Sequence, residues 1–258
     1  MVHITINGKV VKAREGEMLL AAIRRQGIDI PALCHHEAVE PTGNCRLCMV
    51  EITREQWQGW KKYVTSCLYP VEEGLIVSTH TPELIEIRKN LLDLQLARCP
   101  NSEVIQQMAE EYGLTKSSYE SRPDADNCIM CYACTRICEV LGKNAISAAG
   151  RGHDKIITPP FGEPPPDCIG CLACAQICPT DVILWTDDNT VRTIWDKKFD
   201  LISCSQCGKT TITRDFADYL IETRNLPREY FDTCDECKRK NLAHKMGDIV
   251  TAVEEVTL

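Results

Sequence analysis

The sequence predicts an α+β protein made of several small modules, and three observations lead to this fold class. The chain has 258 residues, enough for one large domain or about two to three small ones. Alternating strand patterns open it, and segments with helical periodicity follow. It contains 17 cysteines in separate groups but only 6% aromatic residues. The interiors of the modules are therefore expected to be filled partly by something other than side chains.

The N-terminal region, residues 1–80, is predicted to be a β-grasp domain. Residues 2–13 have the pattern of a hairpin, and the Asn7-Gly8 pair suits its type I′ turn. Residues 18–25 have helical periodicity that ends at Gly27. A strand, a turn, a strand and a helix, followed at once by cysteines, are the opening of a β-grasp ferredoxin.

A helical connector is predicted over residues 81–127. Residues 83–98 and 102–112 have the pattern of amphipathic helices. The polar stretch 114–127, which includes Pro123, is typical of a linker. A cysteine-dense domain is predicted next, at 128–194, and a C-terminal module with a helix at 215–224 completes the chain at 195–258.

Two identical cysteine runs in the domain 128–194 carry the strongest chemical signal. Each has the spacing C-x2-C-x2-C-x3-C, as in bacterial ferredoxins that hold two [4Fe–4S] clusters. Three cysteines of such a run bind one cluster and the fourth binds the other. Zinc is disfavoured, because it prefers two separated pairs. The spacing predicts a first cluster on Cys128, Cys131, Cys134 and Cys178, and a second on Cys168, Cys171, Cys174 and Cys138.

An N-terminal group of four cysteines is predicted to bind a [2Fe–2S] cluster: Cys34, Cys45, Cys48 and Cys67. Its spacing is wider than the plant type but keeps a C-x2-C pair with one outlying cysteine on each side. Gly43 is expected to let backbone N–H groups approach the sulfurs closely. A Rieske-like ligand role for His35 or His36 is the alternative, although four suitable cysteines already exist.

The last two cysteine pairs predict a separate metal site in the C-terminal module. Its candidate ligands are Cys204, Cys207, Cys234 and Cys237. Two C-x2-C pairs favour a closed, zinc-ribbon-like site with one zinc ion. A third [4Fe–4S] cluster is the alternative that four thiols leave open.

The hairpin, the wide cysteine spacing and the two-cluster block together resemble the diaphorase-type iron–sulfur subunit of NAD-reducing [NiFe] hydrogenases. They are equally similar to the N-terminal region of the large iron–sulfur subunit of complex I and to [FeFe] hydrogenases. The resemblance covers about residues 1–185. Those relatives usually carry an intermediate cluster bound by one histidine and three cysteines. Here Cys99 stands near the expected histidine and 100–127 contain neither Cys nor His, so we expect this cluster to be absent and Cys99 to be a buried apolar residue.

The resemblance implies an electron-transfer subunit of a multisubunit oxidoreductase, with no catalytic site of its own. Its implied partners are a flavoprotein subunit that binds NAD(H) and FMN, and a catalytic subunit such as a hydrogenase or a formate dehydrogenase. A freely diffusing polyferredoxin and a redox-sensing regulator are the alternatives.

Composition and sequence patterns also bear on the partners and the cellular location of the protein. The net charge of −8 argues against nucleic acid as a partner. No stretch approaches the roughly 18 apolar residues that a transmembrane segment needs. The N-terminus lacks a signal-peptide pattern, and clustered C-x-x-C spacings favour metal sites over disulfides, so a cytoplasmic, anaerobic setting is expected.

Overall fold

The computed structural model describes residues 1–121 and 126–256, with side chains described as far as residue 246. The described residues form two compact units. Unit 1 comprises Met1–Gly142, Ala148–Ile157 and Cys174–Ile183, and unit 2 comprises Lys143–Ser147, Thr158–Ala173 and the chain from Leu184 onwards. Strands and helices both contribute, which confirms the α+β class. Residues 122–125 of the predicted linker and the last two residues of the predicted C-terminal module lie outside the described residues.

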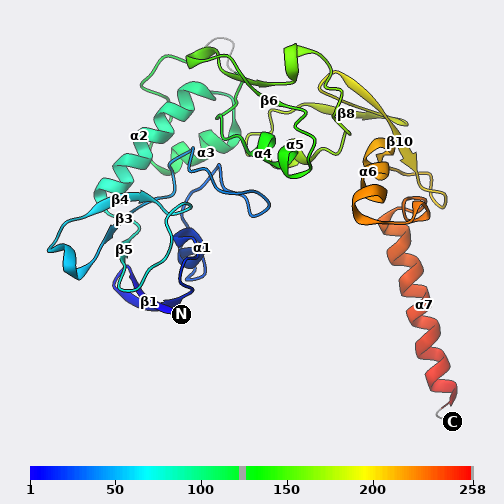
Figure 1. Ribbon diagram of the computed structural model, residues 1–258, viewed down its shortest axis with the longest axis horizontal. Coiled ribbons are helices and arrows are strands. Elements are labelled where there is room, and N and C mark those ends of the chain that lie inside the picture. Colours follow the sequence, from blue (N-terminus) through cyan, green and yellow to red (C-terminus); the bar gives the residue numbers. More distant parts are fainter. Residues whose placement is uncertain (122–125, 257–258) are drawn as a thin grey trace. The chain divides into compact units, whose positions relative to one another are not determined.

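A five-stranded sheet forms the N-terminal part of unit 1 (Figure 1). Its strands are β1 (Val2–Ile6), β2 (Lys9–Ala13), β3 (Met49–Thr53), β4 (Lys62–Thr65) and β5 (Ile76–Ser78), in the order β2-β1-β5-β3-β4. The β1–β2 hairpin confirms its prediction, because Asn7 and Gly8 both have the positive φ of a type I′ turn, 48° and 83°. Helix α1 (Leu19–Arg24) buries its apolar side chains in the same core as the sheet. A short 3₁₀ turn, η1 (Glu55–Trp57), lies between β3 and β4.

The predicted helical connector consists of α2 (Pro82–Arg98) and α3 (Glu103–Glu111). Helix α2 begins at Thr81, whose side chain accepts a hydrogen bond from the backbone N–H of Leu84, and proline is its first residue. The two helices pack against each other and α2 also packs against β3. They share an apolar core with Cys34, Cys45 and Cys131, so they support the loops that carry these cysteines.

Each cysteine run contains a short helix. The first run leads into α4 (Ala133–Val140) and the second into α5 (Ala173–Gln176). Strands β6 (Ser147–Ala149) and β7 (Ile156–Thr158) pair as a two-stranded sheet, with the turns η2 (Gly152–Asp154) and η3 (Pro160–Gly162) nearby in the chain.

Unit 2 contains a four-stranded antiparallel sheet that the sequence patterns did not predict. Its strands are β8 (Trp185–Asp188), β9 (Val191–Ile194), β10 (Lys197–Ser203) and β11 (Thr210–Thr213), in the order β11-β10-β9-β8. Helix α6 (Arg214–Arg224) confirms the helix expected at 215–224. The turn η4 (Arg228–Phe231) and the long helix α7 (Asp235–Val256) complete the described chain.

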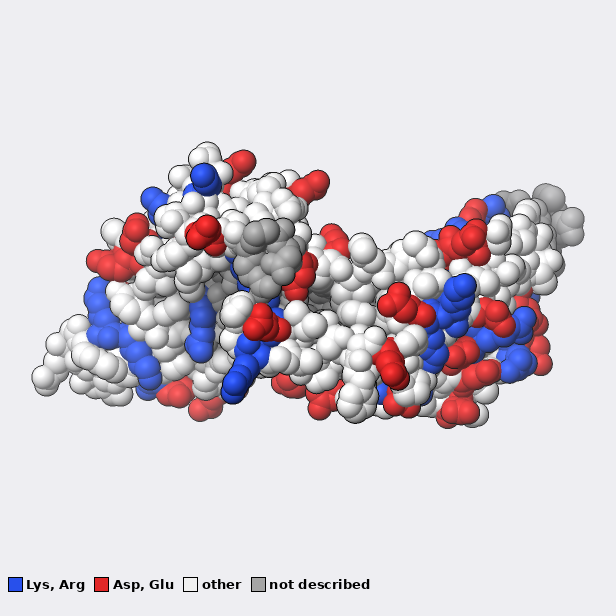
Figure 2. Space-filling view, turned by 90° about the horizontal axis from the view of Figure 1, so that it is seen from above, with Lys and Arg blue, Asp and Glu red and all other residues white. Residues whose placement is uncertain are grey.

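The helices and one face of the molecule give two further observations that bear on function. Among the described residues, no helix combines the length and apolar composition that crossing a bilayer requires. On the face drawn in Figure 2, basic and acidic side chains lie interspersed. Charges of one sign therefore do not dominate this face.

Candidate iron–sulfur and metal centres

The four predicted [2Fe–2S] ligands lie in unit 1, where their sulfurs form two pairs. Cys34 is paired with Cys45, whose backbone N–H donates to the Cys34 sulfur over 3.4 Å. Cys48, immediately before β3, is paired with Cys67, which follows β4, by a hydrogen bond between the side chains. All four side chains are buried. The structure thus brings together the whole predicted group.

Each sulfur pair is prepared to supply a thiolate. A hydrogen bond from the Cys45 thiol, aided by backbone N–H groups and by Arg136, lowers the pKa of Cys34 to about 6. In the same way, a hydrogen bond from the Cys67 thiol lowers the pKa of Cys48 to about 6. The same hydrogen bonds, together with burial, raise the pKa of Cys45 and of Cys67, so within each pair one thiol ionises more readily than the other and can supply the thiolate that binds metal.

The loop before the C-x2-C pair depends on Gly43. Its φ is +65°, and a Cβ there would lie 2.6 Å from Cδ1 of Leu68. The next two backbone N–H groups, of Asn44 and Cys45, bond to the Cys34 sulfur, as expected for this glycine. His36 uses Nδ1 to accept from the backbone N–H of Ala38.

A buried positive charge lies beside the second sulfur pair. Arg88 of α2 is fully buried and donates to the carbonyls of Leu47 and Met49, which flank Cys48, and to that of Thr79. Among the described residues, its Nη1 has no partner and all its acceptors are carbonyls. An uncompensated buried cation costs several kcal/mol. A negatively charged thiolate–iron group nearby would offset that cost, so this site fits a cluster.

The four predicted ligands of the first [4Fe–4S] cluster also lie in unit 1. Electrostatic interactions link Cys178, just after α5, to each of the three thiols of the first run. Burial raises the pKa of Cys131 to about 11 and that of Cys134 to about 12, because a buried thiolate loses its hydration. Four cysteine thiols are the donor set that holds a [4Fe–4S] cluster, so this group suits iron.

The predicted ligands of the second [4Fe–4S] cluster are divided between the units. Cys138 and Cys174 belong to unit 1, whereas Cys168 and Cys171 belong to unit 2. The assignment of these four to one cluster remains a prediction.

The two cysteine runs have matching backbone conformations. At the residue before the second cysteine, Met130 has φ 54° and Gly170 has φ 65°. At the residue after it, Tyr132 has φ 59° and Leu172 has φ 65°. Left-handed φ is uncommon outside glycine, so its recurrence at equivalent positions shows that the two runs fold as structural repeats.

The C-terminal cysteines form a compact site within unit 2. Cys204 follows β10, Cys207 lies in the turn to β11, and Cys234 and Cys237 lie at the start of α7. Their four sulfurs lie within 4.8 Å of one another, with 3.7 Å between those of Cys207 and Cys234. Hydrogen bonds, first of all from the backbone N–H of Cys234, lower the pKa of Cys204 to about 6.

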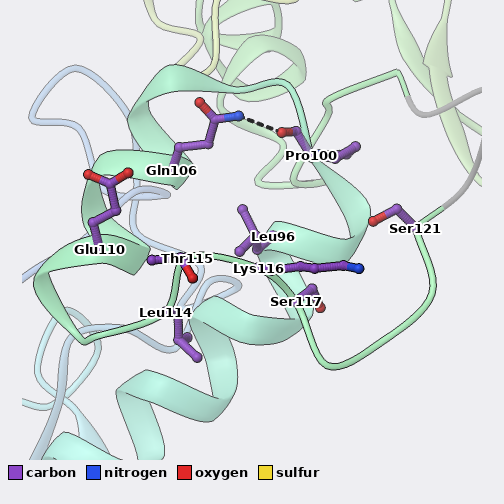
Figure 3. A pocket seen from close by; sticks show the side chains of 9 residues that line it. All are labelled: Leu96, Pro100, Gln106, Glu110, Leu114, Thr115, Lys116, Ser117 and Ser121. Carbon is purple, nitrogen blue, oxygen red and sulfur yellow. Dashed lines mark hydrogen bonds between the residues drawn. The ribbon is translucent and has the colours of Figure 1, made fainter.

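Cys99 is fully buried in the core shared by α2 and α3, as expected, and burial raises its pKa to about 12. A cavity of about 350 Å³, lined by Pro100 among others, lies between the end of α2, α3 and the segment 114–121 (Figure 3). Gln106 donates to the carbonyl of Pro100 at its rim. None of the described residues that line this cavity is a cysteine or a histidine.

The side chains that support the cysteine loops were not predicted from the sequence. Arg98 Nε donates to the carbonyl of Cys128 over 2.6 Å, and Lys197 Nζ donates to that of Cys168 over 2.8 Å. The partners are 30 and 29 residues apart. Only the positive charge of each side chain was visible in the sequence, and a charge alone does not identify its acceptor.

Comparisons with known proteins agree with this arrangement. Residues 1–82 match the model of a 2Fe-2S iron-sulfur cluster binding domain, and residues 165–184 match that of a 4Fe-4S binding domain. A subunit of an NADH-quinone oxidoreductase of Rhizobium meliloti is 27% identical over 81% of this chain and 27% of its own length. The alpha subunit of an NADPH-Fe(3+) oxidoreductase of Geobacter sulfurreducens is 31% identical over 71% of this chain and 24% of its own.

A solved structure extends the likeness to the fold. A chain in the crystal structure of NAD+-reducing [NiFe]-hydrogenase in the H2-reduced state is 27% identical with a TM-score of 0.59, over 70% of this chain and 85% of that one. The present chain spans about a quarter of the length of the two curated relatives. The resemblance expected from the sequence is confirmed: the chain is similar to subunits of NADH-quinone and NADPH-Fe(3+) oxidoreductases and to a chain of an NAD+-reducing hydrogenase, and it matches a 2Fe-2S domain at residues 1–82 and a 4Fe-4S domain at 165–184.

Proposed function

We propose that the chain is an iron–sulfur subunit that relays electrons within a multisubunit oxidoreductase. One observation carries the proposal. Cys34 and Cys45 of the N-terminal group share a single apolar core with Cys131 of the first run. Two cysteine groups with iron–sulfur spacing therefore adjoin the same dry interior, which suits electron transfer between two centres.

Three clusters are proposed, with the ligands expected from the spacings. The paired sulfurs Cys34–Cys45 and Cys48–Cys67 suit a [2Fe–2S] cluster, because each of its two irons takes two thiolates. Cys128, Cys131, Cys134 and Cys178 are proposed to hold one [4Fe–4S] cluster, and Cys168, Cys171, Cys174 and Cys138 the other. When bound, such clusters supply one-electron carriers with potentials between roughly −700 and +450 mV.

The polypeptide excludes water from these thiols and places positive charge and hydrogen-bond donors around them. Buried cysteines exclude water from the sulfurs. Backbone N–H groups that donate to Cys34, together with the buried Arg88, favour negative charge in the N-terminal site. Both effects tune the reduction potential of a bound cluster.

The proposed partners are a flavoprotein subunit that binds NAD(H) and FMN and a catalytic subunit, such as a hydrogenase or a formate dehydrogenase. The names of the relatives support an NAD(P)H-linked system, because they include an NADH-quinone oxidoreductase, an NADPH-Fe(3+) oxidoreductase and an NAD+-reducing hydrogenase. A reducing cytoplasm is the proposed location, because it keeps thiols available for metal.

The C-terminal site is proposed to hold one zinc ion. Zinc–sulfur bonds of about 2.3 Å in a tetrahedron place the sulfurs about 3.8 Å apart. The 3.7 Å between Cys207 and Cys234, within a group that spans no more than 4.8 Å, fits a single ion. In a cubane each cysteine binds a different iron, which requires more widely spaced sulfurs.

Metal analysis of the anaerobically purified full chain tests the cluster assignment. We expect about ten iron atoms, about eight of them from the two [4Fe–4S] clusters, and one zinc per chain. The matched variants are Cys131→Ser, which should lose about four irons, and Cys99→Ala, which should lose none. A colourless wild-type protein without paramagnetic signals on reduction would refute the proposal.

Purification from the source organism tests the place of the chain in a complex. A tagged full-length chain should copurify anaerobically with a flavoprotein subunit and with its flavin. Recovery of the iron-loaded chain alone would favour a freely diffusing polyferredoxin. Oxygen-dependent loss of iron coupled to a change of binding partner would favour a regulator.

A further inference from the structure

Arg136 of α4 makes hydrogen bonds to an unusual set of acceptors. Its guanidinium donates to the carbonyl of Tyr132 through Nε and to that of Glu40 through Nη1. Its Nη2 donates to the carbonyl of Cys34 over 2.8 Å and to that of Cys131 over 3.2 Å. One nitrogen thus binds a cysteine from the N-terminal group and a cysteine from the first run, which is far away in the sequence.

The rigid geometry of the guanidinium is what allows this contact. Its five N–H groups lie in one plane and can reach several acceptors at once, whereas a lysine ammonium is a point charge on a flexible stem. Asn44 gives a second link between the same loops, because its Nδ2 donates to the carbonyl of Cys131 over 3.4 Å. All these residues belong to unit 1.

The guanidinium of Arg136 binds the cysteine loops and not a carboxylate side chain. Every hydrogen-bond acceptor described for its guanidinium is a backbone carbonyl. Its positive charge is therefore not neutralised by a carboxylate among these contacts. A nearby cation stabilises the more negative, reduced form of an iron–sulfur centre and raises its reduction potential.

We propose that Arg136 is a positioning residue that joins the loop of the [2Fe–2S] centre to that of the first [4Fe–4S] centre and raises the potentials of both together. This inference rests on the proposed function, because it takes the ligands of the two clusters as assigned above. Removal of the side chain is expected to alter two centres at once, although a single residue is changed.

Three variants of the full chain separate charge from geometry. Arg136→Gln removes the charge and most of the donors, while Arg136→Lys keeps the charge but loses the planar fork. Arg98→Gln is the matched control, because Arg98 donates to Cys128 of the first run and to Lys155 but to no residue of the N-terminal group among its described contacts. Each anaerobic protein is titrated with reductant, and the clusters are followed by electron paramagnetic resonance.

Arg136→Gln should lower the potentials of the [2Fe–2S] centre and of one [4Fe–4S] centre, and Arg98→Gln only that of a [4Fe–4S] centre. Arg136→Lys should keep both potentials near those of the wild type but weaken the magnetic interaction between the two reduced centres. The inference is overturned if Arg136→Gln retains its iron and shifts neither potential or only one.

If Arg136→Gln does not retain iron, Arg136→Lys decides alone: a weakened magnetic interaction supports the inference and an unchanged one overturns it. Absence of cluster signals from the wild-type chain would instead refute the proposed function. A failure of this inference can therefore be told apart from a failure of the proposed function.

Discussion

The two cysteine runs have the same spacing and matching backbone conformations, but different side chains hold them in place. In the first run, Cys128 is held by Arg98 and Cys131 by Arg136 and Asn44. These donors come from α2, α4 and the loop of the N-terminal cysteine group. The first run is thus supported by Arg136 from within the run and by Arg98 and Asn44 from other segments of unit 1.

The second run is held by three strands of the C-terminal sheet. Three consecutive carbonyls, of Cys168, Ile169 and Gly170, accept hydrogen bonds. Their donors are the side chains of Lys197, Thr213 and Arg192, in that order. The comparison shows that the repeated cysteine spacing goes with the same loop conformation in both runs. The side chains that hold each run in place differ, because they come from different parts of the chain.

Loss of Arg192 should have the largest effect on the second run. Arg192 forms a two-bond ion pair with Asp187, and its side chain is only 7% exposed. Because the Asp187 side chain is 30% exposed, losing the pair costs about 2 kcal/mol, and losing the buried hydrogen bond from Arg192 to the carbonyl of Gly170 adds about 1 kcal/mol. Arg192→Met should therefore lower the anaerobic Tm by roughly 6–12 °C and release iron from one [4Fe–4S] centre while the [2Fe–2S] signal remains.

The control for this variant is the exposed ion pair between Arg228 and Asp218. Exposed pairs contribute less than about 1 kcal/mol, so Arg228→Met should change the Tm little. If the two variants behave alike, the sheet does not support the second run in the way described.

An added methyl group at Gly170 should have the next largest effect. A Cβ there would lie 2.8 Å from Phe199 and 2.9 Å from Thr213. Gly170→Ala should therefore lower the free energy of unfolding by about 2 kcal/mol, mainly through crowding. Met130→Gly at the equivalent position should be nearly neutral, because relief of the left-handed φ offsets the added flexibility of glycine. Thermal melts of the two variants would show whether side-chain packing or backbone strain accounts for the difference in stability between the two runs.

Loss of Lys197 should have the smallest effect on stability and a selective effect on potential. Its ammonium donates to the carbonyls of Pro166 and Cys168 from a partly exposed position, so Lys197→Gln should cost about 1 kcal/mol or less. The potential of one [4Fe–4S] centre should fall, and that of the [2Fe–2S] centre should stay unchanged. A redox titration in which the [2Fe–2S] potential also moves would contradict the separate support of the two runs.

Much of the N-terminal fold could be predicted because its signals are local. The Asn7-Gly8 turn, the cap at Thr81 and the periodicity of 83–98 each specify a structure within a few residues. The cysteine groups were equally visible, since ligand spacing is a property of the sequence itself. The structure brings together the N-terminal and C-terminal groups as expected.

The C-terminal sheet was not predicted, and the turn at its centre lacks the usual Asn-Gly signal, although Asn189 and Gly208 do lie in its other two turns. Trp195 and Asp196 both have positive φ in the turn between β9 and β10, although neither is glycine. A hairpin there gives no turn signal of the Asn-Gly kind. The supporting role of Arg136 was hidden for another reason: its acceptor Cys34 is 102 residues away, and no local pattern encodes such a contact.

The order of the units along the chain has a consequence for biosynthesis. Unit 1 includes residues 174–183, so the chain leaves it and returns to it after 158–173. Once Cys67 has been synthesised, all four cysteines of the N-terminal group are present in the growing chain. Cys178, by contrast, is synthesised long after Cys128. With the ligands proposed above, iron delivered during translation would meet one complete set of sulfurs early and an incomplete set until Cys178 has been synthesised.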